Sequence, residues 1–479
     1  MKLILLTFLF SISSFALVKD AEKLYRSGLN SEKSKQISYE LSRSRYYFSS
    51  SIFAKEFLVR RGSIDLEFEQ HLENLILKTG TLTFSQLDEA TLNRYNTPSL
   101  RFILGLKLFR KNQNVKTIRT LNKFPKNHRF SPEAFFTLGS SYAQLGKRQL
   151  SKNAYDTCIE TSTTLEDQAE NKKLKRYFAI IKETCLIHYA RVLYKLNKFT
   201  EAKEIYQNIP KTSYRWPYLL LERAWNSYQK EDYNRSLGKL VTYKSPLLRS
   251  YFIPEAQYLT ALSYYKLCLY DDSLSKIEQY YTVYRPQSET LKKFLLKNKS
   301  SNTYFLKLML SPIKENEKLN PYIRNLMTQI RKKIKFNLDL INYKKIQNEY
   351  RHLAKMKGRS GLIKILTAEI KTTLSVRTTY LNHYVKKNMF DFVNEIHRFS
   401  FEMFNIKLEI MSNKRDLIYK NKALISDRSR GSWDHVKRDD SQHLYDFKGE
   451  FWADELGDYS FGLKSNCKTV KKKWEEKDV

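Results

Sequence analysis

The densest group of side chains able to hold a metal or move protons lies close to the C-terminal end of the sequence. It contains three aspartates and two histidines, Asp434, His435, Asp439, Asp440 and His443. Carboxylates and imidazoles are common ligands of divalent metals, yet this spacing is equally that of a solvated polar surface, and we favour the second interpretation. The pair Asp454 and Glu455 lacks the apolar pocket that tunes a general acid. We expect no catalytic group, no metal site and no cofactor.

Short motifs of the common enzyme families are missing from the sequence. H-E-x-x-H, G-x-S-x-G, G-x-G-x-x-G and P-loop patterns do not occur in a fitting context. His383 and His397 fall on one predicted helix without a carboxylate partner on their shared face. The sequence therefore predicts a protein that binds rather than one that catalyses.

The charge of the chain favours anionic partners. Lysine and arginine number 85 against 50 aspartates and glutamates, a net charge of +35. A basic helical stretch, Tyr322–Lys357, would suit nucleic acid, but an export signal argues against that partner and we expect none. Glycine (13) and proline (10) are scarce, which disfavours glycine-rich nucleotide loops and folds with many tight turns.

The first residues of the sequence have the pattern of a signal peptide. A basic start, Met1-Lys2, precedes an apolar run from Leu3 to Phe15, which is too short to span a membrane. Small residues at Ser14 and Ala16 fit cleavage after Ala16. We expect residues 1–16 to be removed and the mature chain to be exported to the periplasm or cell envelope, with no transmembrane segment. An uncleaved membrane anchor is the alternative.

A pattern of small and bulky residues recurs between residues 98 and 286. Copies begin near residues 98, 132, 183, 217 and 254, with steps of 34, 51, 34 and 37. Small residues such as Gly139, Ala190, Ala224 and Ala261 occupy one position of the first helix in each copy. The pattern resembles tetratricopeptide (TPR) repeats, in which two helices pack through such positions and neighbouring repeats must stack.

The resemblance implies a groove lined by the first helix of each repeat, where a peptide or helix of a protein partner binds. About half of the aromatic residues are expected to pack between repeats instead. By register, the groove residues are Phe102, Phe109, Arg110, Phe136, Arg191, Tyr194, Lys195, Trp225, Tyr228, Tyr258, Tyr265 and Lys266.

Four cysteines, Cys158, Cys185, Cys268 and Cys467, show no C-x-x-C spacing. The repeat register places Cys158 and Cys185 at facing helix ends, so these two form the expected pair if a disulfide exists in an oxidising compartment. Buried free thiols are the other interpretation, and it is favoured.

Helical patterns continue on both sides of the repeats. Residues 17–97 read as helices with one degenerate repeat around Ala54, and Phe68, Leu72, Leu75 and Ile76 are expected in its core. Residues 287–427 predict a long basic antiparallel helical hairpin. Its second arm carries a heptad seam typical of coiled coils, formed by Met389, Phe392, Ile396, Phe399, Met403, Ile406 and Ile410. A parallel dimeric coiled coil is the alternative.

The tail, residues 428–479, is acidic and aromatic before it ends in a basic stretch. We expect a small cap that buries Phe447, Trp452 and Phe461. The string YDFKGEFWADELGDYSFGL before Cys467 resembles the closing motif of exported TPR proteins of gliding and predatory bacteria. The fold class expected is all-α: a TPR-like α-solenoid, a coiled-coil-like hairpin and this cap.

The function expected is that of a non-enzymatic protein-protein interaction scaffold of the bacterial cell envelope. The resemblance of the tail implies an assembly related to motility or the cell surface. The alternative is a binder of anionic cell-wall glycan, or an accessory to a wall-remodelling enzyme, because the charge and the tyrosine-rich groove would suit an anionic envelope polymer.

Overall fold

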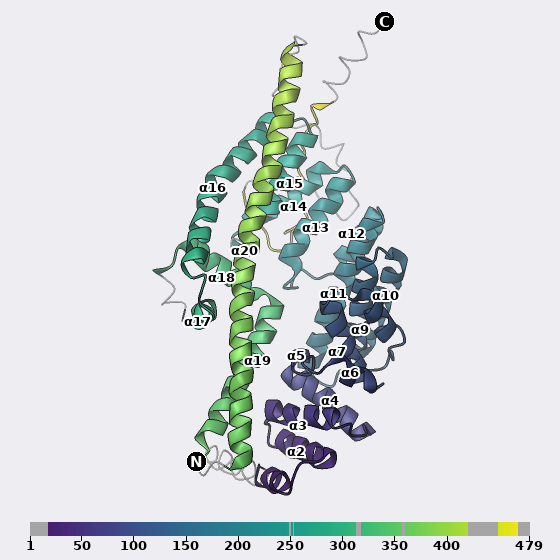
Figure 1. Cartoon of the computed structure of the whole chain (residues 1–479). Helices are drawn as coiled ribbons and strands as arrows, with labels where there is room; N and C mark the ends of the chain where they lie inside the picture. The colour runs from purple at the N-terminus through teal and green to yellow at the C-terminus, as the bar shows by residue number, and fades with distance from the viewer. Residues whose placement is uncertain are drawn as a thin grey trace, which may run out of the picture. The chain divides into compact units, whose positions relative to one another are not determined.

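The structure, a computed structural model, describes residues 18–248, 251, 253–312, 318–356, 360–419 and 449–467. Three expectations lie outside these residues: the signal peptide at 1–16, the Asp/His cluster at 434–443 and the burial of Phe447 in the cap. Among the described residues, no helix has the length and apolarity needed to cross a membrane. These residues are helical apart from turns, loops and the segment 449–467, so the all-α expectation is confirmed (Figure 1).

The chain folds into two compact units. Unit 1 comprises Met1–Val192 and Asn337–Leu381, and unit 2 comprises Leu193–Phe336 and Asn382–Val479. Three helices contribute residues to both units: α11 (Lys172–Lys195), α19 (Ile334–Lys355) and α20 (Gly361–Tyr419). Each unit is therefore built from a run of repeats and a later part of the chain.

Unit 1 contains the first repeats. Its helices before α11 are α2 (Ser31–Arg43), α3 (Tyr47–Val59), α4 (Leu66–Thr79), α5 (Thr81–Phe84), α6 (Glu89–Arg94), α7 (Pro98–Arg110), α8 (Asn114–Leu121), α9 (Ser131–Gln144) and α10 (Arg148–Asp167). Phe68, Leu72, Leu75 and Ile76 of α4 are buried, as expected. Gly80, at a φ of 85°, ends that helix.

Unit 2 contains the later repeats. Its helices after α11 are α12 (Phe199–Gln207), α13 (Trp216–Gln229), α14 (Tyr233–Val241), α15 (Pro254–Lys266), α16 (Tyr270–Lys297), α17 (Tyr304–Leu310) and α18 (Pro321–Lys332). Two 3-10 turns, η1 (Thr242–Lys244) and η2 (Pro246–Leu248), connect α14 towards α15. The first helices of the repeats thus begin at residues 98, 131, 172, 216 and 254, close to the expected starts except at the insertion, where α10 and α11 are both long.

Small residues allow the two helices of a repeat to approach closely. A β-carbon at Gly139 would lie 2.8 Å from the ring of Tyr155, and one at Gly105 would lie 2.6 Å from Leu121. Ala190, Ala224 and Ala261 take the same position in later repeats and are fully buried. The TPR-like register is confirmed by these contacts.

The turn inside each repeat has one backbone form. In the described part of the chain, Arg45, Asn112, Gly146, Asn197, Glu231 and Cys268 all have φ between 55° and 70°. The next N–H returns to a carbonyl five residues earlier, as from Gln113 to Leu108 at 3.0 Å. This is a Schellman turn, which ends a helix by satisfying its last carbonyls. Arg45 has the same turn between α2 and α3, but so does Arg61 after α3, so a repeat formed by α2 and α3 needs a second mark.

A serine hydrogen bond marks the same repeat. Ser151 Oγ donates to the carbonyl of Gly139 at 2.8 Å, and Ser273 Oγ donates to that of Ala261 at 2.9 Å. Ser50 Oγ donates to the carbonyl of Ser38 at 2.6 Å, with the same spacing of 12 residues. The degenerate repeat of residues 17–97 therefore uses Ser38 and Ser50 as its small positions, while Ala54 lies one turn further along α3.

In unit 1, α19 and the start of α20 fold back on each other. Ile346 and Leu353 of α19 share one core with Leu362 and Leu366 of α20 and with residues of α2 and α3. Glu349 of α19 accepts hydrogen bonds from Ser49 N at 2.7 Å and Ser49 Oγ at 2.6 Å, at the start of α3. The hairpin is therefore anchored to the first repeat.

In unit 2, the heptad seam of α20 is buried, but its partner differs from the one expected. Tyr280 OH of α16 donates to the Ile396 carbonyl at 2.9 Å, and the ring of Tyr322 of α18 lies 6.0 Å from that of Phe392. The seam packs on repeat and linker helices of unit 2 rather than on the other arm of the hairpin. At 59 residues, α20 is far longer than the 22-residue α19, so its second half needs another partner.

Two helix boundaries also differ from expectation. Helix α16 continues through Pro286 to Lys297, because the exposed proline costs only one backbone hydrogen bond on a solvent-facing side. The stretch Tyr322–Lys357 is broken at Lys333, whose ψ of 125° separates α18 from α19.

Candidate interaction surfaces

In unit 1, the expected groove residues of α7 and α9 have different environments. Phe102 is only 2% exposed and stacks on Phe130 with ring centroids 4.8 Å apart, so it belongs to the core and does not line a groove. Phe109 and Phe136 are half-buried. Arg110 binds other residues of unit 1, because it donates to Ser85 Oγ at 3.2 Å and to Thr81 Oγ1 at 3.1 Å.

In unit 2, the groove of α15 is occupied by the second half of α20. The ring of Tyr258 lies 5.4 Å from that of Phe399. The hydroxyl of Tyr265 accepts from Asn413 Nδ2 at 3.5 Å, and Lys414 Nζ lies 2.6 Å from Asp271 Oδ1 at the start of α16. Tyr258 and Tyr265 therefore contact a helix, as the TPR resemblance implies, but that helix belongs to the same chain.

Two tyrosines of this groove have raised pKa values, because they are buried and lie near carboxylates of α20. Burial raises the pKa of Tyr265 to about 12, and a hydrogen bond with Glu409 adds to the shift. Burial also raises the pKa of Tyr258, with a further contribution from Glu402 and Glu409. Both tyrosines stay neutral at physiological pH and can donate hydrogen bonds to acidic side chains of a seated helix.

Trp225 and Tyr228 of α13 lie at the edge of a small core formed by α13, α14 and α15. Trp225 Nε1 donates to Glu255 Oε1 at 2.9 Å, and its ring is edge-on to that of Tyr228 with centroids 5.5 Å apart. Both side chains are half-buried. Tyr194, also half-buried, packs edge-on against Phe199 at 5.4 Å. These three aromatic residues pack between helices and also contribute the exposed part of their rings to the surface.

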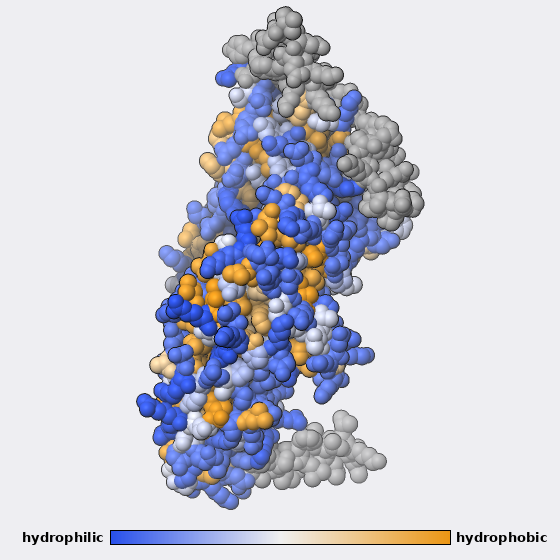
Figure 2. Space-filling view, turned by 90° about the vertical axis from the view of Figure 1, so that its right-hand side faces the viewer, coloured by the Kyte–Doolittle hydropathy of each residue, from blue (hydrophilic) through white to orange (hydrophobic). Residues whose placement is uncertain are grey.

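The cations expected in the groove are accessible. Arg191 and Lys195 of α11 and Lys266 of α15 are exposed. Arg191 Nη1 lies 3.3 Å from His188 Nε2. The face turned to the viewer in Figure 2 is mostly hydrophilic with scattered hydrophobic areas.

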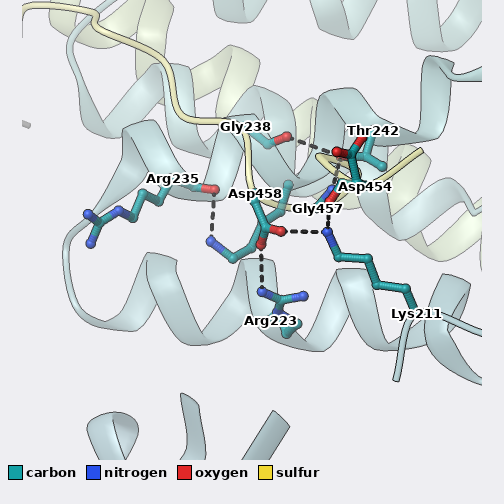
Figure 3. Close-up of polar contacts among 9 residues, drawn as sticks. Lys211, Arg223, Arg235, Gly238, Thr242, Asp454, Gly457 and Asp458 are labelled. Atoms are coloured by element: carbon teal, nitrogen blue, oxygen red, sulfur yellow. Dashed lines mark hydrogen bonds and ion pairs between the residues drawn. The ribbon is translucent and has the colours of Figure 1, made fainter. Parts of the chain in front are cut away.

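The C-terminal segment, residues 449–467, binds across the repeats of unit 2. Asp458 lies 2.7 Å from Lys211 Nζ and 3.2 Å from Arg223 Nη2, and Lys211 also donates to the carbonyl of Asp454 (Figure 3). Gly457 N donates to Thr242 Oγ1 at 3.1 Å. The acidic turn of the segment is thus bound by two cations, Lys211 of the α12–α13 connection and Arg223 of α13.

Glycines on both sides permit this close approach. Gly457 has a φ of 86°, and a β-carbon there would lie 2.7 Å from Leu220 and 3.0 Å from Trp216. Leu456, next to it, is 5% exposed. On the repeat side, Gly238 of α14 leaves room for the main chain of Tyr459. The Gly-Asp-Tyr part of the tail motif is therefore a docking element.

Further along, Asn234 holds the segment in an extended form. Its Oδ1 accepts from Leu463 N at 3.0 Å and its Nδ2 donates to the Leu463 carbonyl at 3.1 Å. Phe461 and Leu463 pack against Leu237, Leu267 and Leu269. Phe461 is therefore packed, as expected of the cap, but Trp452 is 59% exposed and does not fill a core; Phe447 lies outside the described residues.

A lysine beneath the segment has an altered pKa. Burial lowers the pKa of Lys239 to about 7, and nearby Arg223 lowers it further. Its Nζ lies 3.4 Å from the Arg235 carbonyl. Proximity to Asp458 acts in the opposite direction. Burial of the ammonium group therefore explains the shift of the Lys239 pKa.

All four cysteines are paired. Cys158 of α10 is bonded to Cys185 of α11, and Cys268 is bonded to Cys467 at the end of the C-terminal segment, with Cα–Cα separations of 6.2 and 5.2 Å. The second pair joins residues 199 apart, and no local pattern in the sequence pointed to it. The described residues hold no group of three or more His, Cys, Asp or Glu side chains arranged to bind a metal.

Sequence comparisons give no match: no family model fits the chain and no curated protein is similar to it. Among solved structures, the apo form of RapI is similar at 11% identity with a TM-score of 0.34, over 75% of this chain and 99% of that one. The Rap conjugation gene regulator of plasmid pLS20, solved with the Phr* peptide, has 11% identity and a TM-score of 0.28, over 78% and 96%. At these TM-scores the likeness carries no argument about ligand or partner.

Proposed function

We propose that this protein is a non-enzymatic, protein-binding scaffold built from TPR-like repeats and exported to the periplasm or cell envelope. One observation carries the proposal: the tyrosine-lined groove of α15 already holds a helix, the second half of α20. A surface that binds a helix of its own chain has the shape and chemistry to bind protein segments.

The chemistry of that contact indicates what such a repeat surface prefers. Tyrosine rings offer flat apolar area, and their hydroxyls meet backbone carbonyls or carboxylates, as Tyr281 OH meets the Ser400 carbonyl at 2.7 Å. Seam residues Met403, Ile406 and Ile410 are buried at the same time. The preferred ligand is an amphipathic helix with apolar residues at heptad spacing.

Export is supported by the two disulfides, because disulfides persist in oxidising compartments. The resemblance of the tail to exported TPR proteins of gliding and predatory bacteria supports a place in a motility or cell-surface assembly. The motif residues Gly457, Asp458 and Tyr459 are the ones that dock on the repeats, which gives the pattern a structural purpose.

In-cell photo-crosslinking tests the scaffold function. A photoreactive residue at Lys195 or Lys266, both exposed groove positions, should crosslink the mature chain to one defined protein in the envelope fraction. The same residue at exposed Gln207 on α12, a second helix of its repeat, is the matched control. Mass spectrometry of the purified chain should find Leu17 as the first residue. Crosslinks of equal yield at all three positions, or an intact Met1, would contradict the proposal.

The alternative function, binding of anionic wall glycan, rests on the exposed cations Arg191, Lys195 and Lys266. Purified wall material that binds the chain and is released by salt, with no protein recovered by crosslinking, would favour it.

A further inference from the structure

Helix α20 carries a second row of apolar side chains that faces away from its buried seam. Phe401, Phe404, Leu408 and Met411 are 65%, 48%, 52% and 49% exposed. Their spacing of 3, 4 and 3 residues puts them in one line along the helix, over roughly 15 Å at ~1.5 Å per residue. We call these four residues the outer row.

The outer row and the seam lie on nearly opposite sides of the helix. Met403, Ile406 and Ile410 of the seam are at most 4% exposed. With about 100° of rotation per residue, the mean direction of the outer row lies roughly 150° from that of these seam residues. One side of α20 therefore satisfies the fold, and the other presents two phenylalanines, a leucine and a methionine to solvent, a composition typical of contact sites.

Cations lie on both sides of the outer row. Lys407 is exposed on one side of it and Arg398 on the other, where the Arg398 guanidinium also lies 4.4 Å from the ring centre of Phe399 and Glu409 is exposed as well. The carboxylates of the same stretch, Glu402 and Glu409, act on Tyr258 and Tyr265 of the repeats. The apolar row thus has a cation on each border, Lys407 alone on one side and Arg398 together with Glu409 on the other.

We propose that the outer row is a docking site for an amphipathic helix of another protein, with apolar residues at heptad spacing and carboxylates on both borders. The apolar residues of that helix pack against Phe401, Phe404, Leu408 and Met411, and its carboxylates pair with Arg398 and Lys407. The inference rests on the proposed scaffold function and names the class of partner.

A second copy of this chain fits the row poorly. In an antiparallel pairing centred near Ile406, Phe401 would meet Met411 of the other copy, but Lys407 would lie beside the other copy's Lys407. In a parallel pairing, Lys407 would lie beside Ser412 of the other copy, where no carboxylate meets it. Like charges at such border positions oppose association, so the charge pattern selects an acidic partner over self-association.

A membrane surface fits less well than a helix. The row is a narrow line of four side chains, whereas interfacial helices bury a broad apolar face. The opposite face of α20 is occupied by the repeats of unit 2. A line with heptad spacing matches the knobs that one helix offers another.

Two synthetic peptides of about three heptads test the proposal. Both have leucines at heptad spacing; one has glutamates at the border positions and the other has lysines there. Binding to the oxidised, full-length mature chain is measured by fluorescence anisotropy. The glutamate peptide should bind at least about tenfold more tightly than the lysine peptide.

Three variants locate the site. Phe404→Ser should weaken the glutamate peptide about tenfold or more, whereas the control Leu296→Ser, at a residue of α16 that is 53% exposed, should leave its affinity unchanged. Lys407→Glu should weaken the glutamate peptide about two- to fivefold and strengthen the lysine peptide by a similar factor, as exposed ion pairs do.

Several results overturn the inference. Equal binding of the two peptides, or equal loss in the Phe404 and Leu296 variants, would show unspecific adsorption. Binding only to vesicles of anionic lipid would assign the row to a membrane, and a dimer in sedimentation that Phe404→Ser dissolves would assign it to a second copy. If crosslinking at Lys195 or Lys266 still recovers a defined protein, the scaffold function survives the loss of this inference.

Discussion

A β-carbon placed on Gly238 would lie 1.9 Å from the carbonyl oxygen of Tyr459, although the two residues are 221 positions apart in the sequence. The contact involves main chain on the Tyr459 side, which cannot rotate away as a side chain can. Helix α14 therefore needs a glycine at this position, and the C-terminal segment sets that need.

Replacing Gly238 by alanine should detach the middle of the C-terminal segment. Over-packing of this kind costs about 1–3 kcal/mol, and here it falls on the main chain of the segment, between the ion pairs of Asp458 and the hydrogen bonds of Leu463. Hydrogen exchange of residues 453–463 should become markedly faster while α13 and α15 change little. Gly361→Ala is the matched control, since a β-carbon there meets its nearest atom at 4.0 Å. Equal protection of the segment in both variants would show that the contact does not hold it.

Loss of the Cys268–Cys467 disulfide should free the end of the chain. A chain-entropy estimate for a loop of 199 residues gives about 5 kcal/mol as an upper bound. In Cys467→Ser, trypsin should cut after exposed Lys464 faster than in the parent, as followed by mass spectrometry. The Cys185→Ser variant, which lacks the other bond, should show the parental rate at Lys464; if it is equally fast, general destabilisation is the cause.

Gly139→Leu should destabilise unit 1. The new side chain would collide with the ring of Tyr155, which is 1% exposed, so the cost should reach or exceed about 1–3 kcal/mol. A lower melting temperature in calorimetry checks this. The exposed neighbour Gln144→Leu should leave the melting temperature within a degree or two, and a similar melting temperature for Gly139→Leu would refute the register of that repeat.

Glu349 should make stability depend on pH. Burial raises the pKa of Glu349 from its usual value of 4.5 to about 7, against the hydrogen bonds from Ser49 and Phe48. The folded state therefore holds this proton more tightly than the unfolded state, and the contribution of Glu349 to stability falls as pH rises from about 4.5 to 7. Glu349→Gln should remove that slope, seen by subtracting urea-unfolding curves of parent and variant at several pH values. A slope that is unchanged by the substitution would contradict the assignment.

Trp225→Ala should lower stability as well as any partner binding. The indole packs at the edge of the core formed by Ala224, Leu240 and Leu259 and donates to Glu255. Trp225→Phe keeps the ring and loses the hydrogen bond, so it should cost about 1 kcal/mol, clearly less than the alanine variant. Chemical unfolding of both variants measures the difference, and equal costs would mean that packing of the ring contributes little.

The repeats were predictable from sequence because local spacing determines them. Gly139, Ala190, Ala224 and Ala261 recur at regular offsets, and the helices that stack within the repeats are neighbours in the sequence. The same locality explains the buried seam of α20, since heptad spacing says which residues are buried. Heptad spacing does not say which helices the seam packs against, so the sequence did not predict Tyr280 and Tyr322 as its partners.

Long-range features had no local signal. The bond between Cys268 and Cys467 and the pairing of Asn234 with Leu463 depend on where the tail returns after more than 190 residues. Phe102 was misplaced because the TPR register gives the direction of a side chain but not the presence of Phe130 over it. The outer row of α20 could have been predicted from the sequence. A helix that packs through one seam needs one apolar row, and residues 401, 404, 408 and 411 form a second.

Because α20 occupies the groove of α15, a free helix can bind there only above a certain concentration. Because α20 is tethered, it acts as a ligand present at an effective concentration in the millimolar range. A free helix with the same intrinsic affinity would have to reach millimolar levels to displace half of it, so ordinary cellular abundances would leave the groove occupied. Partners present at micromolar levels are thus directed to the surfaces that α20 leaves open, which include the exposed groove positions Lys195 and Lys266 and the outer row.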